Sequence, residues 1–170
     1  MTTPTVLTGS DAIFARDARR VGDLPENAQI EVTVRLRARR AAQAAPAEGG
    51  PPLLDANEYA MLSGASEADV ATVGEFAEAA GLTVARAEPV RRAMVLRASP
   101  TAFARAFGVQ LGVFQRAGEK HRSYAEPIRL APTLAPVVQA VIGFEDARAA
   151  RTCLLWARAA PPVSALTHRA

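Results

Sequence analysis

The sequence predicts an α+β domain in which an antiparallel sheet carries helices on one face. Residues 66–82 place apolar side chains at helical spacing, residues 30–37 alternate apolar with polar side chains, and residues 93–97 form the short apolar run typical of a central strand. Segments with helical periodicity that alternate with segments of strand periodicity indicate a sheet layer packed against a helix layer. At 170 residues, the chain is long enough for one such domain with a core.

The first predicted strand runs from Ile30 to Arg37. Its core-facing residues are expected to be Ile30, Val32, Val34 and Leu36. Residues 1–27, broken by glycine and proline, form an N-terminal arm. Residues 38–52, rich in alanine, glycine and proline, predict a flexible loop, and residues 53–61 a short helix.

The best-defined predicted helix spans Ser66 to Leu82. Ser66 is its expected N-cap, with Asp69 in the capping-box position, and Gly81 is its expected left-handed C-cap. Its apolar stripe comprises Val70, Val73, Phe76, Ala77 and Ala80. A second strand, residues 82–88, follows directly.

A turn at Pro89 leads into the third strand, and Ser99 then caps a second helix with Pro100 at its first position. Gly108 ends that helix. The remaining predicted elements are a hairpin of residues 109–115 and 120–124, an extended segment at 128–130, a short helix at 132–141 and a last strand from Phe144. This order is a ferredoxin-like split β-α-β open sandwich.

Composition argues against several functional classes. The net charge of +3 arises from 20 basic and 17 acidic residues, and a nucleic-acid surface would need the basic residues to cluster on one face. Residues 37–40 (RARR) could form a small basic patch, but a solvated strand end is the favoured interpretation. The single cysteine, Cys153, permits no intrachain disulfide. The N-terminus does not resemble a signal peptide, and no apolar run reaches the roughly 18 to 20 residues of a membrane helix.

Motifs for catalysis or cofactor binding are absent from the sequence. The histidines are His121 and His168, which lack metal-ligand spacing and are expected to be solvated. No serine lies in a nucleophile elbow, and there is no glycine-rich phosphate loop. We therefore predict no catalytic residues, no metal site and no cofactor. These absences favour a binding or regulatory domain.

Five segments resemble the pro-domain (activation domain) of the sedolisin/kumamolisin family of serine-carboxyl peptidases. They are Leu62–Val84 (LSGASEADVATVGEFAEAAGLTV), Ile30–Arg37, Ala104–Leu111 (ARAFGVQL), the hairpin return Arg122–Tyr124 with Ile128–Leu130, and Pro132–Glu145 (PTLAPVVQAVIGFE). They occur in the family's order. They assign residues 28–151 to a pro-kumamolisin-like domain and residues 152–170 to a C-terminal tail.

The resemblance implies both a fold and a role. In that family the pro-domain packs by its sheet on the peptidase domain, helps it fold and blocks its active site until acid-triggered removal. The implied partner is a sedolisin-type catalytic domain, in cis or in trans, with no nucleic acid or membrane involved. The resemblance also implies secretion. The family's catalytic Ser, Glu and Asp belong to a following domain for which this chain has no matching motif, so the chain is expected to be a regulatory segment and not an enzyme.

Two sets of residues are candidates for inhibition and its release. The tail is expected to lie extended in a cleft, with its anchors at Arg151, Leu154, Leu155, Trp156 and Arg158. Alternatively, residues 154–156 complete the domain core. The candidate pH-sensitive interface carboxylates are Glu67, Asp69, Glu75, Glu78 and Glu145. A carboxylate paired across an interface stops stabilising it when acid protonates the carboxylate. The alternative is that these are ordinary surface charges.

Two other functions remain open at this stage. The chain could be a stand-alone interaction module that kept the pro-domain fold, or a ferredoxin-like nucleic-acid binder. The latter is disfavoured because the predicted strands carry few aromatic residues for base stacking. The sequence is compatible with an excised fragment and with a free-standing protein.

Overall fold

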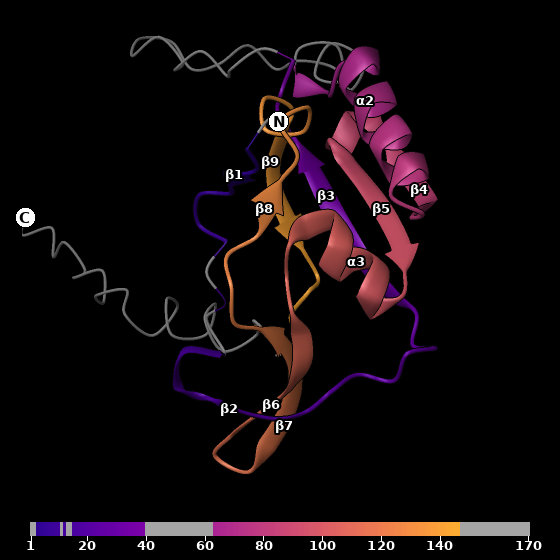
Figure 1. The fold of residues 1–170 in the computed structure, drawn as a ribbon. Helices are drawn as coiled ribbons and strands as arrows, with labels where there is room; N and C mark the ends of the chain where they lie inside the picture. Colours follow the sequence, from indigo (N-terminus) through magenta and orange to yellow (C-terminus); the bar gives the residue numbers. More distant parts are fainter. Residues whose placement is uncertain (1–2, 11, 13–14, 40–62, 147–170) are drawn as a thin grey trace, which may run out of the picture.

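The computed structural model describes residues 3–10, 12, 15–39 and 63–146, and these form two helices packed on antiparallel sheets (Figure 1). The helices are α2 (Glu67–Ala79) and α3 (Pro100–Phe107), with short 3-10 turns η1 (Ala15–Asp17) and η2 (Pro89–Arg91). The strands are β1 (Thr5–Val6), β2 (Arg19–Gly22), β3 (Ile30–Leu36), β4 (Thr83–Glu88), β5 (Ala93–Ala98), β6 (Leu111–Arg116), β7 (Glu119–Tyr124), β8 (Arg129–Leu130) and β9 (Val138–Ile142).

The main sheet has four strands in the order β4-β5-β3-β9, and every neighbouring pair is antiparallel. Helix α2 connects β3 with β4, and α3 follows β5. Both helices contribute to the core on one side of this sheet (Figure 1). This topology confirms the predicted α+β fold with a split β-α-β arrangement.

Local signals in the sequence account for the helix boundaries. The Oγ of Ser66 accepts a hydrogen bond from the Asp69 amide at 3.0 Å, and the Oγ of Ser99 accepts one from the Ala102 amide at 3.2 Å. Each cap satisfies a backbone donor that has no partner within the helix. Gly81 and Gly108 take the positive φ values, 70° and 64°, that a left-handed helix end requires.

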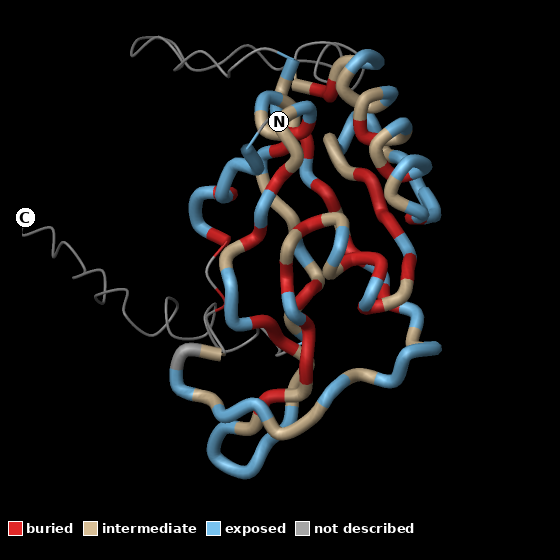
Figure 2. The backbone as a smooth tube through the Cα atoms, viewed as in Figure 1, coloured by how far each residue is buried: buried red, intermediate tan, exposed pale blue. Residues whose placement is uncertain are grey.

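The core lies between the helices and the inward face of the main sheet (Figure 2). The alternating residues of β3, from Ile30 to Leu36, are buried as predicted. Phe103 and Phe107 of α3 are fully buried, and both rings pack on Phe144 with centroid distances of 5.5 and 5.7 Å. Edge-to-face contacts of this kind contribute beyond simple area burial.

The prediction for residues 132–141 is wrong. Residues 132–137 form consecutive turns, residues 138–142 are strand β9, and Phe144 follows that strand instead of opening one. The turns include a helical step, because the Val138 amide donates to the Leu134 carbonyl at 2.8 Å. β9 then pairs with the edge of β3, and Val138 becomes fully buried. Tertiary pairing of a Val- and Ile-rich segment therefore outweighs local helical preference.

A second sheet, β2-β6-β7, extends beyond the main one. β6 and β7 form the predicted hairpin, whose turn residues Ala117 and Gly118 both have positive φ, as in a type I′ turn. Residues of the N-terminal arm pack on this region: the Tyr124 hydroxyl donates to the Ser10 carbonyl at 2.8 Å, and the Ile128 amide donates to the Ser10 Oγ at 3.0 Å. The predicted helix at 53–61 and nearly all of the loop at 38–52 lie outside the described residues.

Candidate functional site

The face of the main sheet that points away from the helices, here called the open face, carries the first candidate site. Strand registers align its residues in three rows across the sheet: Thr83–Arg97–Glu31, Arg86–Val95–Thr33–Ile142 and Glu88–Ala93–Arg35–Ala140. Along each strand, these residues alternate with those that face the core, so they point to the opposite side of the sheet. The open face is therefore mainly polar; its exposed apolar residue is Ile142, whereas Val95 in the same row is buried.

Most charges on the open face already have partners. Arg97 forms an ion pair with Glu31, and the Nε of Arg86 lies 2.9 Å from a carboxylate oxygen of Glu88. Arg35 lies in the central strand with Ala93 and Ala140 beside it, and no carboxylate of the described residues pairs with it. Such an arginine is available to bind an anionic group of a partner bidentately.

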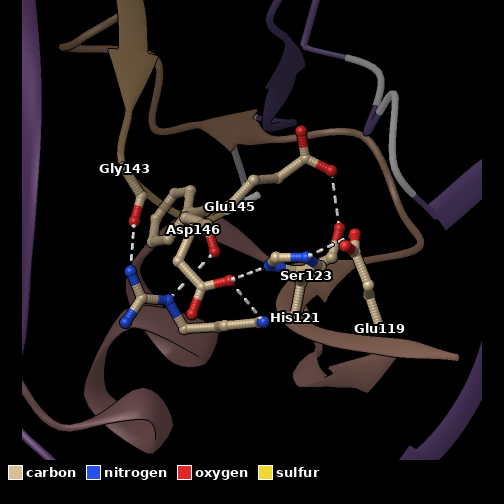
Figure 3. Close-up of polar contacts among 8 residues, drawn as sticks. Glu119, His121, Ser123, Gly143, Glu145 and Asp146 are labelled. Carbon is tan, nitrogen blue, oxygen red and sulfur yellow. Dashed lines mark hydrogen bonds and ion pairs between the residues drawn. The ribbon is translucent and has the colours of Figure 1, made fainter. Parts of the chain in front are cut away.

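A polar cluster forms the second candidate site, where the described chain ends (Figure 3). Residues Gly143–Asp146, here called the exit segment, follow β9 and lie beside β7. The Arg122 amide donates to the Asp146 Oδ1 at 2.7 Å, and the Asp146 amide donates to the Arg122 carbonyl at 3.2 Å. The guanidinium of Arg122 also donates to the carbonyls of Phe144 and Gly143, at 3.2 and 3.0 Å.

Alternate residues of β7 complete the cluster. The Ser123 hydroxyl, which is fully buried, donates to the Glu145 Oε1 at 2.6 Å. The imidazole of His121 lies between two carboxylates, with its Nδ1 3.5 Å from Asp146 and its Nε2 3.6 Å from Glu119 (Figure 3). The His121 side chain is only 25% exposed, so the expectation of a solvated histidine is wrong.

Two features of the backbone position the exit segment. Gly143 has a φ of 108°, and a side chain there would approach the Glu31 carbonyl oxygen to 3.0 Å. Glycine is therefore required where the chain turns away from the sheet. Phe144 then inserts into the core, where its ring also lies 5.9 Å from that of Tyr124.

The structure separates the predicted carboxylates. Glu67, Glu75 and Glu78 are exposed on α2 and Asp69 is half-buried there, so all four lie on the helix layer and not on the open face. Glu145 instead belongs to the cluster. Their proposed role in sensing pH stays a prediction. The tail anchors Arg151, Leu154, Leu155, Trp156 and Arg158, like Cys153 and His168, lie outside the described residues.

Sequence reasoning did not identify the partners in the cluster. Glu119, His121 and Ser123 alternate on one strand, but the partners of His121 and Ser123 on the exit segment lie more than twenty residues further along the chain. Within the described ranges, no group of three or more acidic, histidine or cysteine side chains is arranged to hold a metal ion. No helix in the same ranges has the length and apolar character needed to span a membrane.

Comparison with known proteins identifies the family. Residues 16–147 match the family model described as "Pro-kumamolisin, activation domain". The chain is also 34% identical over 154 residues to kumamolisin of Bacillus sp. (strain MN-32). This alignment covers 86% of the chain and 28% of kumamolisin, so the chain spans less than a third of that protein. The matched family is an activation domain and not a catalytic domain. The chain therefore belongs to the pro-kumamolisin activation-domain family.

Proposed function

We propose that this chain acts as the pro-domain of a sedolisin-type serine peptidase, assisting the folding of the catalytic domain and inhibiting it until acid releases the complex. The observation that carries the proposal is the open face of the main sheet. Helices cover only one side of that sheet, and the other side presents ordered side chains with no covering element among the described residues. A two-layer domain of this kind offers a rigid, preformed docking surface.

The open face also has the composition of an interface. Thr33 on the inner strand β3 and Ile142, 56% exposed on the edge strand β9, are neighbours across the open face, and charged residues flank them. Because Arg35 has no carboxylate partner in the described part of the chain, we propose that a carboxylate of the catalytic domain pairs with it. Such a charge-assisted bond would be strong at neutral pH.

Acid release follows from the same pairing. Protonation of a partner carboxylate removes the ion pair, so the complex loses that contribution as the pH falls. The four carboxylates of α2 would take part only if the catalytic domain also reaches the helix layer. Glu145 differs from these four because it accepts a hydrogen bond from Ser123 within the domain.

The tail contributes to inhibition in this proposal. Beyond the exit segment, residues Arg151, Leu154, Leu155, Trp156 and Arg158 would occupy the active-site cleft in an extended conformation. The chain would act in cis or in trans within a secreted precursor system, without peptidase activity of its own and without nucleic acid or membrane as a partner.

The test is inhibition of a sedolisin-type catalytic domain by the purified chain, measured near neutral pH and near pH 4. We expect strong inhibition that weakens in acid. Thr33→Arg, at the centre of the open face, should abolish inhibition, whereas Ala71→Arg, on the exposed side of α2, should not. No inhibition at either pH would contradict the proposal and favour a stand-alone interaction module. Equal effects of the two variants would contradict docking by the open face.

A further inference from the structure

We propose that the polar cluster between β7 and the exit segment is an acid-opened clamp, which holds the exit segment against β7 at neutral pH and frees Glu145 and Asp146 in acid. The clamp comprises His121, Arg122 and Ser123 on β7 and Glu145 and Asp146 on the exit segment. Its opening is a property of this chain alone. Only its consequence for a bound peptidase rests on the proposed function.

Hydrogen bonds from β7 hold the backbone of the exit segment in place. Arg122 and Asp146 exchange two hydrogen bonds, one from each amide, so the exit segment pairs with the edge of β7 that β6 leaves uncovered. The Arg122 guanidinium holds two further carbonyls, those of Gly143 and Phe144. Gly143, Phe144 and Asp146 are thus hydrogen-bonded to Arg122, and Glu145 is held by Ser123.

Two of these bonds have a carboxylate as the acceptor. Asp146 accepts from the Arg122 amide and lies beside His121, and Glu145 accepts from the buried Ser123 hydroxyl. A hydrogen bond to an ionised carboxylate is roughly twice as strong as one between neutral groups. Protonation of both carboxyl groups would therefore weaken the clamp at two adjacent positions.

Several charged groups surround the clamp. His121 faces Glu119 on its own strand and Asp146 on the exit segment. On the same face of the second sheet lie Arg116 of β6, the register partner of Glu119, and Arg20 of β2, which is paired with Asp23. The clamp should open when acid removes the charges of Glu145 and Asp146.

The clamp acts at the junction between the domain and the residues that follow it. Phe144 is anchored in the core, and Gly143 is fixed by its close approach to β3, so the start of the exit segment should stay in place. Opening would free Glu145 and Asp146. The segment proposed to occupy the peptidase cleft follows these two residues in the sequence.

The test uses backbone NMR on the isolated full chain, titrated from about pH 7 to about pH 3. We expect the order parameters of Glu145 and Asp146 to stay near 0.85 in mild acid and to fall below about 0.6 in strong acid, while the main sheet stays ordered. The Arg122 amide proton should shift in the same pH range, since it loses a carboxylate acceptor. Unchanged order at these residues in a folded, strongly acidic sample would overturn the proposal.

If strong acid unfolds the domain, amide variants measured at neutral pH test the same proposal. The double variant E145Q/D146N mimics the protonated carboxyl groups at neutral pH and should lower the order parameters of residues 145 and 146 without acid. Glu126→Gln, an exposed carboxylate in the loop after β7, is the matched control and should change nothing. Wild-type order in the double variant would also overturn the proposal. None of these measurements involves a peptidase, so failure of the proposed function would leave them unaffected.

Discussion

The two faces of the main sheet differ in what holds their side chains in place. On β3, Val32, Val34 and Leu36 are fully buried under the helices, while Glu31, Thr33 and Arg35 alternate with them on the open face. Apolar burial, the dominant favourable term in folding, determines the first set. The second set contributes little to that term. Alternate residues of this seven-residue strand therefore form the core, and the residues between them belong to the surface proposed to bind the catalytic domain. Substitutions should separate the two roles.

The largest expected effect is on the covered side. Phe103→Ala removes a fully buried ring that packs on Phe107 and Phe144, with centroid distances of 6.2 and 5.5 Å. The variant should lower the free energy of unfolding by about 3–5 kcal/mol. Urea unfolding followed by circular dichroism measures this loss. A loss below about 1 kcal/mol would mean that the aromatic cluster is not the centre of the core.

Gly143→Ala should have the next largest effect on stability. Its φ of 108° strains any side chain, and the new methyl group would meet backbone atoms of Glu31 and Val32, which cannot move without disturbing β3. We expect a loss of about 1–3 kcal/mol in the free energy of unfolding. Gly74→Ala is the matched control: it lies within α2, nothing lies within 4 Å of the added atom, and alanine is the better helix former. Equal effects of the two variants would contradict the close approach at Gly143.

The contrast between the faces also explains how much could be predicted from the sequence. The caps at Ser66 and Ser99 and the alternation from Ile30 to Leu36 are local signals, and all appear in the structure. The segment that became β9 was misassigned because its strand conformation depends on pairing with β3, about a hundred residues earlier. Local preference contains no information about such a partner.

The candidate sites follow the same rule. The sequence identified Glu145 as a carboxylate of interest but not its bond to Ser123, because nothing in the spacing of the two residues indicates that they meet. Arg35 was not identified at all, since one exposed arginine among nineteen has no distinguishing local context. Its position became informative only when the register placed it between Ala93 and Ala140.

On the open face, Arg35→Gln should affect binding and leave stability unchanged. Loss of a charge-assisted bond to a partner carboxylate typically costs about 1.5–3 kcal/mol, which corresponds to a roughly 10- to 150-fold weaker affinity. Inhibition constants at near-neutral pH measure the effect, and it should shrink at acid pH, where the wild type has lost the same bond. Arg105→Gln, an exposed arginine on α3, is the matched control and should bind as the wild type does. If Arg105→Gln weakens inhibition as much as Arg35→Gln, the partner is not docked on the open face.

Ile142→Ala should produce the smallest effect. It tests whether a residue of the open face at the edge of the sheet contributes to partner binding without contributing to folding. Ile142 is the last residue of β9, at the opposite end of the strand from the buried Val138, and 56% of it is exposed on the open face. Truncation should change the free energy of unfolding by less than about 0.5 kcal/mol. It should weaken inhibition by about 1 kcal/mol, roughly fivefold, because only part of the side chain would be buried by a partner. Thermal unfolding and inhibition constants, measured on the same preparation, test both halves. A large loss of stability with unchanged inhibition would mean that Ile142 contributes to folding and not to binding. The division between core residues and proposed binding residues on β3 would then not hold on the edge strand β9.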